Sequence, residues 1–263
     1  MRELERDPLP SPLNATPLVV VGRGRVGRSF ATAAAQAGIE VRLVAHHEAV
    51  ESIPPEAAVL LCVPDRAIAE LSSQLSAPAP ALIGHVSGAM TLEALAPATR
   101  LGGAFSLHPL QTFVEPETPL EGTRAAVAGS DQQSLDHARA LAEALGMRPF
   151  DVPEESRAAY HAAAALSSNL LVALEESAAH LLERIGVEDA RQLLAPLVLR
   201  TAANWAERGP DALTGPVARG DLATVERHRA AIAVTAPELL PSYDALTERA
   251  EALGGESRER ASA

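Results

Sequence analysis

The chain has 263 residues, and its 47% hydrophobic content can fill the core of one large domain or two small ones. A formal net charge of −12 would repel a phosphate backbone, so we expect no nucleic acid partner. No apolar run approaches the roughly 20 residues that cross a bilayer, and the N-terminal residues do not resemble a signal peptide, so we expect no membrane partner and a cytoplasmic location.

The first half of the chain alternates short apolar runs with helical segments. Residues 1–16 are charged and contain prolines, and we expect them to be disordered. The predicted strands are residues 18–21, 39–45, 57–63, 81–86, 103–107 and 124–128. The predicted helices between them are residues 25–37 and 65–75. Such alternation predicts an α/β fold, a Rossmann-type doubly wound parallel sheet, in a dinucleotide-binding domain over residues 17–153.

The second half of the chain has helical patterns and almost no strand-like run. We predict helices over residues 154–185, 188–207, 221–234 and 237–253, the first ended by Gly186 and the second kinked at Pro196. They form an all-α C-terminal domain for substrate binding and dimerisation, residues 154–253, before a disordered tail, residues 254–263. Many alanines would let helices approach closely and favour a homodimer through this half; alternatively, alanine only supports helix formation.

The sequence contains no lysine, and this absence restricts its chemistry. All 22 basic residues other than histidine are arginines, which stay protonated at any workable pH. A proton donor or acceptor must therefore be a histidine, a carboxylate, a tyrosine, a cysteine or water. The single cysteine, Cys62, lies in an apolar run and is expected to be a buried inert thiol. We expect no metal site, because the histidines and the cysteine lack a ligand spacing.

A glycine motif stands between the first predicted strand and the first predicted helix. It reads Gly22-Arg23-Gly24-Arg25-Val26-Gly27, the G-x-G-x-x-G spacing of dinucleotide-binding turns. The first glycine permits the tight turn, the second leaves room for the pyrophosphate, and the third lets helix and strand pack closely. The helix N-terminus then offers free amide donors to the phosphates. This motif predicts that the protein binds a nicotinamide dinucleotide.

The residues after the second predicted strand favour NADP over NAD. NAD sites usually have an acidic side chain there, which accepts hydrogen bonds from the ribose hydroxyls. Here the strand ends at His46 and His47, and these histidines and Arg23 suit a ribose phosphate. Glu48 is near enough to serve NAD, which remains the less favoured alternative.

Other candidate residues follow the strands at the edge of the sheet where ligands bind. Val63 and Pro64 follow the third strand and are expected near the cofactor, with a plain helix start as the alternative. His85 and Ser87 follow the fourth strand; Ser87 would contact cofactor and substrate, and His85 would contact substrate or serve only the structure. His108 follows the fifth strand, where the next proline holds it extended, and it is a catalytic candidate or part of a plain turn.

The helical half supplies four more candidates. His161, Ser168 and Asn169 return to nearly the same face of the predicted long helix and could form a polar patch for a substrate. Hydrogen bonds to neighbouring helices are the alternative. Arg219 lies in a loop that ends at a helix cap, Asp221, and its guanidinium group suits a carboxylate or phosphate, unless the loop is purely structural.

Together these segments resemble a bacterial family described as a Rossmann-like domain plus domain of unknown function 2520. The resemblance rests on residues 22–27, 85–88, 105–113, 160–169 and 214–221. The family is similar to F420-dependent NADP oxidoreductases, pyrroline-carboxylate reductases and 6-phosphogluconate-dehydrogenase-like proteins, and some members resemble a ketopantoate reductase. The resemblance implies a helical half of the 6-phosphogluconate dehydrogenase C-terminal type and a cleft between the halves. Since this chain lacks the lysine of related dehydrogenases, His161 would replace it beside Asn169.

Our leading hypothesis is an NADPH-dependent reductase of a small anionic carbonyl or imine substrate. His161, or otherwise His108, would donate the proton, while Asn169 and Ser87 orient the substrate and Arg219 holds its anionic end. The first alternative is a non-catalytic NADP-binding sensor or regulatory protein. A dehydrogenase that works in the oxidative direction is the second.

Overall fold

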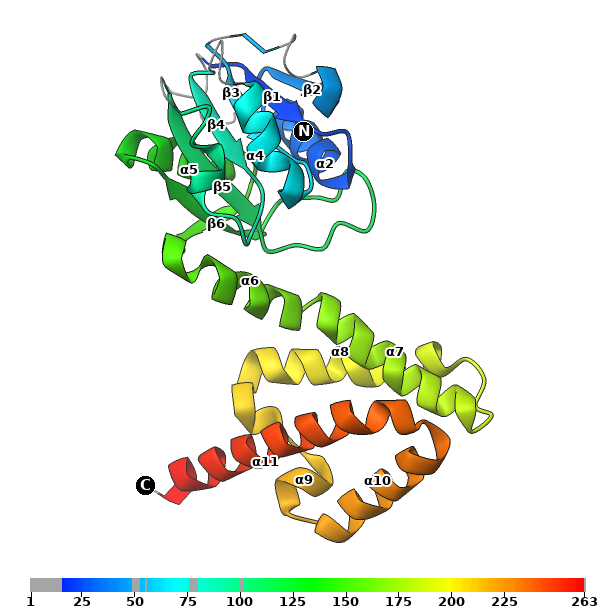
Figure 1. The fold of residues 1–263 in the computed structure, drawn as a ribbon. Helices are drawn as coiled ribbons and strands as arrows, with labels where there is room; N and C mark the ends of the chain where they lie inside the picture. The colour runs from blue at the N-terminus through cyan, green and yellow to red at the C-terminus, as the bar shows by residue number, and fades with distance from the viewer. Residues whose placement is uncertain (1–15, 49–52, 55, 76–79, 100–101, 263) are drawn as a thin grey trace, which may run out of the picture. The chain divides into compact units, whose positions relative to one another are not determined.

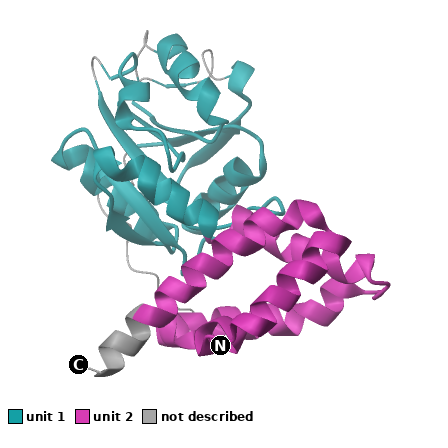
Figure 2. Cartoon of the chain, turned by 60° about the horizontal axis from the view of Figure 1, so that its bottom comes forward, with its two compact units in different colours: residues 1–166 teal, residues 167–263 magenta. Residues whose placement is uncertain are grey.

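The computed structural model describes residues 16–48, 53–54, 56–75, 80–99 and 102–262, and the side chains up to residue 255. Apart from residue 16, the N-terminal segment predicted to be disordered lies outside this range. The chain divides into two compact units, Met1–Leu166 and Ser167–Ala263, which Figure 2 draws in different colours. Among the described helices, none is both long and apolar enough to cross a membrane.

The first unit contains a seven-stranded sheet with the order β2-β1-β3-β4-β5-β6-β7. The strands are β1 (Leu18–Val21), β2 (Val41–Val44), β3 (Ala58–Leu61), β4 (Leu82–His85), β5 (Gly103–Pro109), β6 (Arg124–Gly129) and β7 (Arg148–Asp151). All neighbouring pairs are parallel except β5 and β6, which are antiparallel. The Rossmann-type prediction is confirmed, but the sheet is not wholly parallel. Residues 110–123 contain no crossover helix, and a parallel neighbour would need one.

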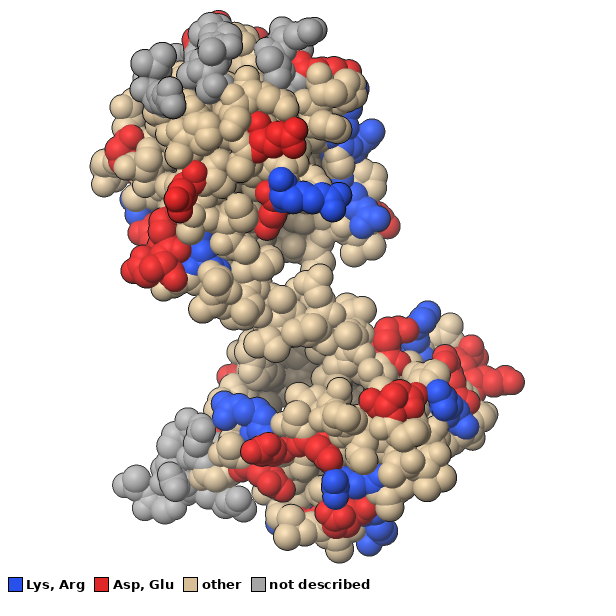
Figure 3. Space-filling view, in the orientation of Figure 1, with Lys and Arg blue, Asp and Glu red and all other residues tan. Residues whose placement is uncertain are grey.

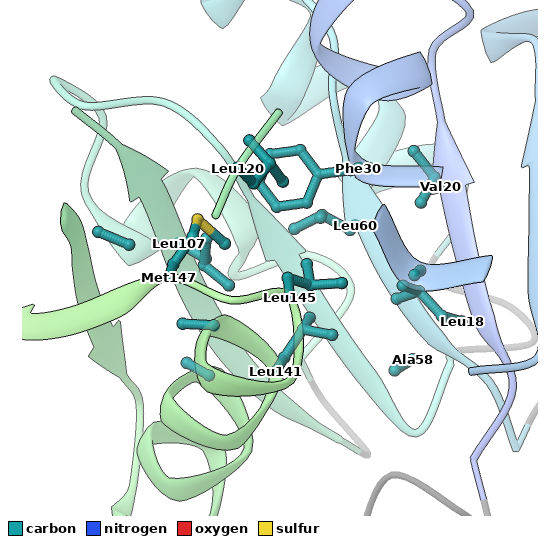
Figure 4. Packing of buried hydrophobic residues seen from close by; sticks show 14 of the residues in the cluster. Leu18, Val20, Phe30, Ala58, Leu60, Leu107, Leu120, Leu141, Leu145 and Met147 are labelled. Atoms are coloured by element: carbon teal, nitrogen blue, oxygen red, sulfur yellow. The ribbon is translucent and has the colours of Figure 1, made fainter. Parts of the chain in front are cut away.

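Helices cover both faces of this sheet (Figure 1). Side chains that alternate along β1 divide between two apolar clusters: Leu18 and Val20 belong to one, and Val19 and Val21 to the other. The first cluster contains residues of α2 (Arg25–Gln36) and α5 (Gln132–Ala144), and Figure 4 shows its packing. The second contains residues of α4 (Asp65–Gln74) and of the short helix η2 (Leu92–Leu95). Strands buried on both faces explain the continuous apolar runs in the sequence.

The C-terminal part of the chain is helical, as predicted. Its helices are α6 (Arg157–Leu166), α7 (Asn169–Arg184), α8 (Ala190–Arg208), α9 (Gly215–Arg219), α10 (Leu222–Thr235) and α11 (Leu240–Ser262). Short 3₁₀ helices occur in both halves of the chain. One, η1 (His46–Glu48), follows β2, and the others are η3 (Glu154–Ser156), η4 (Gly209–Ala212) and η5 (Pro237–Leu239). Asp221 caps α10 as expected, because its carboxylate accepts a hydrogen bond from the Thr224 amide at 3.1 Å.

Three details of this part differ from the prediction. The long helix over residues 154–185 is two helices, since Ser168 leaves the helical region with φ −135° and ψ −86°. Serine and asparagine compete with the helical backbone for hydrogen bonds, which accounts for a break at this Ser-Ser-Asn run. The loop before Asp221 contains the short helix α9, and α11 continues to Ser262 where a disordered tail was predicted.

The two units divide at a later residue than the predicted boundary of 153. Helix α6 belongs to the unit of the sheet, because Arg157 and Tyr160 on this helix hydrogen-bond to residues of β5. The first unit therefore contains His161 as well as the glycine motif.

Candidate functional site

The glycine motif forms the tight turn that its spacing predicts. Gly22 has a φ of +121°, and a Cβ there would lie 2.2 Å from the carbonyl oxygen of Cys62. A Cβ on Gly27 would lie 1.8 Å from the carbonyl oxygen of Gly22. Neither position can hold a side chain. A Cβ on Gly24, by contrast, would have no atom of the described residues within 4 Å, so the backbone there is open to a ligand.

Helix α2 begins at this open position, and no side chain in the described part of the protein caps its first amides. Gly24 is the N-cap and provides no side-chain hydrogen bond, and the first turn has no acidic residue. Unsatisfied N–H groups and the positive end of the helix dipole favour an anion here. Val26 packs against the apolar core, and Arg25 donates a hydrogen bond to the Phe113 carbonyl at 3.3 Å. The turn fits a diphosphate group.

The turn lies at the point where the strand order reverses, because β2 and β3 pair with opposite edges of β1. A Cβ on Gly22 would lie 3.4 Å from a methyl carbon of Val63, so the loop after β3 adjoins the turn. Pro64 begins α4, again without a side-chain cap. Cys62 in the same loop is buried, and burial raises the pKa of its thiol far above the usual range, in agreement with an inert role.

Arg23 forms an ion pair that the sequence analysis did not predict. Its guanidinium nitrogens lie 2.8 and 3.4 Å from the two carboxylate oxygens of Glu48. Glu48 also accepts a hydrogen bond from the Ala45 amide at 3.2 Å. His46 is exposed in the same 3₁₀ turn. Arg23 is thus engaged by the Glu48 carboxylate at the end of β2, and His46 is exposed beside this ion pair.

Two predicted residues, one at the end of β4 and one in the loop after it, are buried. The ring of His85 is fully buried, and its Nε2 lies 3.4 Å from the Thr91 carbonyl. Burial and, to a lesser degree, Arg157 lower the pKa of His85 to about 4. Such a ring offers no surface to a substrate, so the predicted substrate contact of His85 is wrong. Ser87 is buried too, and its hydroxyl oxygen accepts hydrogen bonds from the amides of Ala89 and Met90.

His108 and His161 meet beside the same loop. Their ring centroids are 5.8 Å apart, although they come from β5 and α6. A Cβ on Gly88 would lie 2.6 Å from Nδ1 of His161 and 2.8 Å from Nε2 of His108. Both rings thus pack directly on Gly88, and any side chain at this position would displace them. His161 is exposed, whereas His108 is partly buried.

Tyr160 completes this cluster as the hydrogen-bond partner of His108. Its hydroxyl oxygen lies 2.7 Å from Nδ1 of His108. Burial, followed by the nearby His161 and Arg157, lowers the pKa of His108 to about 4. Burial also raises the pKa of Tyr160 to about 12. At neutral pH the pair therefore consists of an uncharged imidazole and a protonated phenol.

A buried arginine joins α6 to the sheet. Arg157 is 1% exposed, and its guanidinium group contacts the Ser106 hydroxyl and the Ser87 carbonyl. It also pairs with Glu154 at 2.7 Å, and Glu154 accepts a hydrogen bond from the Leu92 amide. Each of the three guanidinium nitrogens has an oxygen partner, which offsets the cost of burying the charge. Arg157 thereby fixes α6, and with it Tyr160 and His161, against β5.

The remaining predicted residues belong to the second unit. The Ser168 hydroxyl donates a hydrogen bond to the Asn169 side-chain oxygen at 2.9 Å, at the beginning of α7. Arg219 ends α9 and is exposed, and it forms no ion pair with another described residue. These three side chains are polar groups that a ligand could contact.

Sequence reasoning missed Tyr160, Arg157, Gly88 and the pairing of Glu48. Tyr160 was adjacent to the predicted His161, and the lack of lysine had already placed tyrosine among the possible proton donors. Arg157 gave no signal, because an arginine one turn into a helix is usually exposed.

Comparison with known families agrees with this architecture. Residues 123–250 match the profile of a family described as Domain of unknown function (DUF2520). The chain carries a DUF2520 domain. Since this match begins just before β6, the DUF2520 domain includes the last strands of the sheet, α6 and most of the helical unit. The resemblance inferred from the sequence is therefore confirmed.

Solved structures show the same fold for nearly the whole chain. A Bacteroides fragilis protein, provisionally described as an NADP oxidoreductase, is 22% identical with a TM-score of 0.75, over 90% of this chain and 98% of its own. A Thermotoga maritima protein without a functional name is 25% identical with a TM-score of 0.74, over 92% and 99%. Pyrroline carboxylate reductase of Plasmodium falciparum, solved with NADP bound, is 13% identical with a TM-score of 0.58, over 92% and 99%. No curated protein matches the sequence.

Proposed function

We propose that the protein is an NADPH-dependent reductase of a small carbonyl or imine compound that carries an acidic group. The observation that carries this proposal is the open backbone at Gly24, in front of the uncapped N-terminus of α2. The names of two structural relatives mention NADP, and one relative acts on pyrroline carboxylate, a cyclic imine with an acidic group. The chain shares their fold, which is compatible with this class of reaction.

The residues of this chain have distinct roles in the proposed reaction. The first amides of α2 hold the diphosphate, Val63 and Pro64 flank the coenzyme, and Arg23 and His46 bind its ribose phosphate. NADPH, when bound, supplies the hydride. His161 donates the proton, since its ring is exposed beside His108 and its imidazole can serve as a general acid.

Further residues would hold the substrate. In this proposal Asn169 and Ser87 orient the reacting oxygen or nitrogen, and Ser168 adds a hydrogen bond. Arg219 holds the acidic group through its forked donors.

Coenzyme binding can be tested at the open glycine. Gly24→Ala should keep the fold, because its Cβ meets no atom within 4 Å, but it should weaken NADPH binding at least tenfold by obstructing the diphosphate. Isothermal titration calorimetry with NADPH, NADP, NADH and NAD measures this. Gly255→Ala in α11 is the matched control, since a Cβ there also meets no atom. Failure of the wild-type protein to bind any of the four coenzymes would disprove the proposal.

The rival sensor function differs in its turnover. A sensor binds NADPH but does not oxidise it with any member of a panel of carbonyl and imine acids, whereas a reductase oxidises it with at least one. A dehydrogenase would instead turn over with the oxidised coenzyme and a hydroxy or amino acid.

We also propose that the helical unit mediates a homodimer. Large apolar side chains on α7 and α8 are more than half exposed, namely Leu170, Val172, Leu193, Leu197, Leu199 and Trp205. Residues 190–206 of α8 contain no Asp or Glu, although the chain has a net charge of −12. In Figure 3 the surface around α8 is mostly uncharged. A second copy can approach such a surface without the charge repulsion that the rest of the chain would impose.

A further inference from the structure

The hydrogen bond between Tyr160 and His108 decides which ring nitrogen of His108 carries a hydrogen. The phenol oxygen is 2.7 Å from Nδ1, and the two rings meet edge to face at 89°. A neutral imidazole has one N–H group and one acceptor nitrogen. If Nδ1 accepts from Tyr160, the hydrogen must be on Nε2.

The surroundings of the pair favour donation from Tyr160. The pKa of His108, near 4, keeps the ring neutral at neutral pH, and the pKa of Tyr160, near 12, keeps the phenol protonated. If Nδ1 were the donor, the phenolic hydrogen would have no acceptor among the described residues. A partly buried hydroxyl group without an acceptor is unfavourable.

We propose that Tyr160 is a positioning residue that holds His108 in the tautomer with its hydrogen on Nε2. This nitrogen packs against Gly88, on which the ring of His161 also packs. It forms no hydrogen bond with another described residue, so its N–H group is available to a ligand oxygen or nitrogen. His108 is then a neutral hydrogen-bond donor, and the exposed His161 beside it keeps the role of proton donor that the proposed reaction gives it. Only this catalytic consequence rests on the proposed reductase function; the tautomer does not.

The tautomer can be measured without any coenzyme. Long-range ¹H–¹⁵N spectra of the labelled full chain at neutral pH distinguish the protonated from the unprotonated ring nitrogen of each histidine, and His108→Gln assigns the signals. The wild type should have His108 in the Nε2–H form. In Tyr160→Phe the ratio of the Nε2–H to the Nδ1–H form should fall about fivefold, the change that one hydrogen bond supports.

A second His–Tyr pair gives a matched control. Nδ1 of His228 lies 3.0 Å from the hydroxyl of Tyr243 in the second unit. Tyr243→Phe should change only the signals of His228. The proposal is wrong if wild-type His108 is in the Nδ1–H form, or if Tyr160→Phe leaves its populations unchanged. The first of these outcomes does not need Tyr160→Phe, so it decides the matter even if that variant fails to fold.

A kinetic measurement separates this proposal from the reductase function. If the reductase function holds, Tyr160→Phe should lower kcat while the KM for NADPH stays the same. If the protein binds no NADPH and His108 still has the proposed tautomer, the reductase function fails and the positioning role of Tyr160 stands.

Discussion

Glu48 bears on the choice of coenzyme, because it lies beside Arg23 at the end of β2. Glu48→Gln would remove a carboxylate that repels a ribose phosphate and would release Arg23 from its ion pair. We expect NADPH to bind roughly fivefold more tightly, the scale of an exposed ion pair, and NADH to bind less tightly. Calorimetry with both coenzymes measures the change. A variant that favours NADH would contradict the assignment of Arg23 to the phosphate.

His161 should affect turnover more than binding. Removal of a general acid typically lowers the rate by roughly 10²-fold or more, so His161→Ala should lower kcat by that factor and leave the Kd of NADPH nearly unchanged. Steady-state kinetics and calorimetry separate the two effects. His180→Ala, on an exposed face of α7, is the control. Equal activity of His161→Ala and wild type would remove His161 from the mechanism.

At the scale of single residues, the candidate site was partly predictable from the sequence. The glycine motif could be predicted because each of its glycines meets a steric demand of the strand-turn-helix backbone. His108 and His161 were each named from the sequence, but their contact was not, because it depends on how α6 packs against β5. The burial of His85 was missed for the same reason: the packing of η2 and its neighbours encloses this ring.

At the scale of elements, Arg157 should decide whether α6 stays on the sheet. Arg157→Met leaves the Ser106 hydroxyl, the Ser87 carbonyl and the Glu154 carboxylate without their donor. A buried polar group left without its hydrogen-bond partner costs about 1–3 kcal/mol, so chemical denaturation should show a loss of about 2 kcal/mol or more. Arg139→Met removes an exposed pair with Asp151 and should cost less than about 1 kcal/mol. Equal losses in both variants would refute the structural role of Arg157.

Helix α5 contains a histidine that should make stability depend on pH. Burial lowers the pKa of His137 to about 4, and its Nε2 has no hydrogen-bond partner among the described residues; its ring lies edge-on to that of Phe105. Between the unfolded value near 6.5 and the folded value, the unfolded chain binds more protons, so stability falls as the pH falls through this window. His85 and His108 act in the same direction.

Replacement of His137 should flatten this pH dependence. Denaturation at pH 7 and at pH 4.5 should show His137→Leu losing less stability than wild type, by on the order of 2 kcal/mol. His180→Leu, at a partly exposed position, should follow the wild type. If both variants lose as much as wild type, His137 is protonated in the folded state.

The elements themselves were mostly predictable because their apolar periodicity matches their burial. Strands β1 and β3 are buried on both faces and gave continuous apolar runs. Strand β7 was missed because it is short and partly exposed, with polar ends. The helix break at Ser168 was missed because an apolar pattern continues across it.

At the scale of the whole molecule, the proposed dimer predicts that a charged substitution on α8 halves the mass of the protein in solution. Leu197→Glu adds a carboxylate to an exposed apolar face of α8 and should convert a dimer to a monomer in analytical ultracentrifugation. Leu246→Glu, on α11, is a control at a similarly exposed leucine. A wild-type protein that sediments as a monomer at micromolar concentration would contradict the proposal.

The glycine turn, His108, Tyr160 and His161 all belong to Met1–Leu166. If the proposed reductase function holds, residues 167–263 can be exchanged for other helices to alter substrate preference, while the parts proposed to hold the coenzyme and donate the proton are inherited unchanged. Diversification of one segment of the gene would then yield new specificities from a single reaction chemistry.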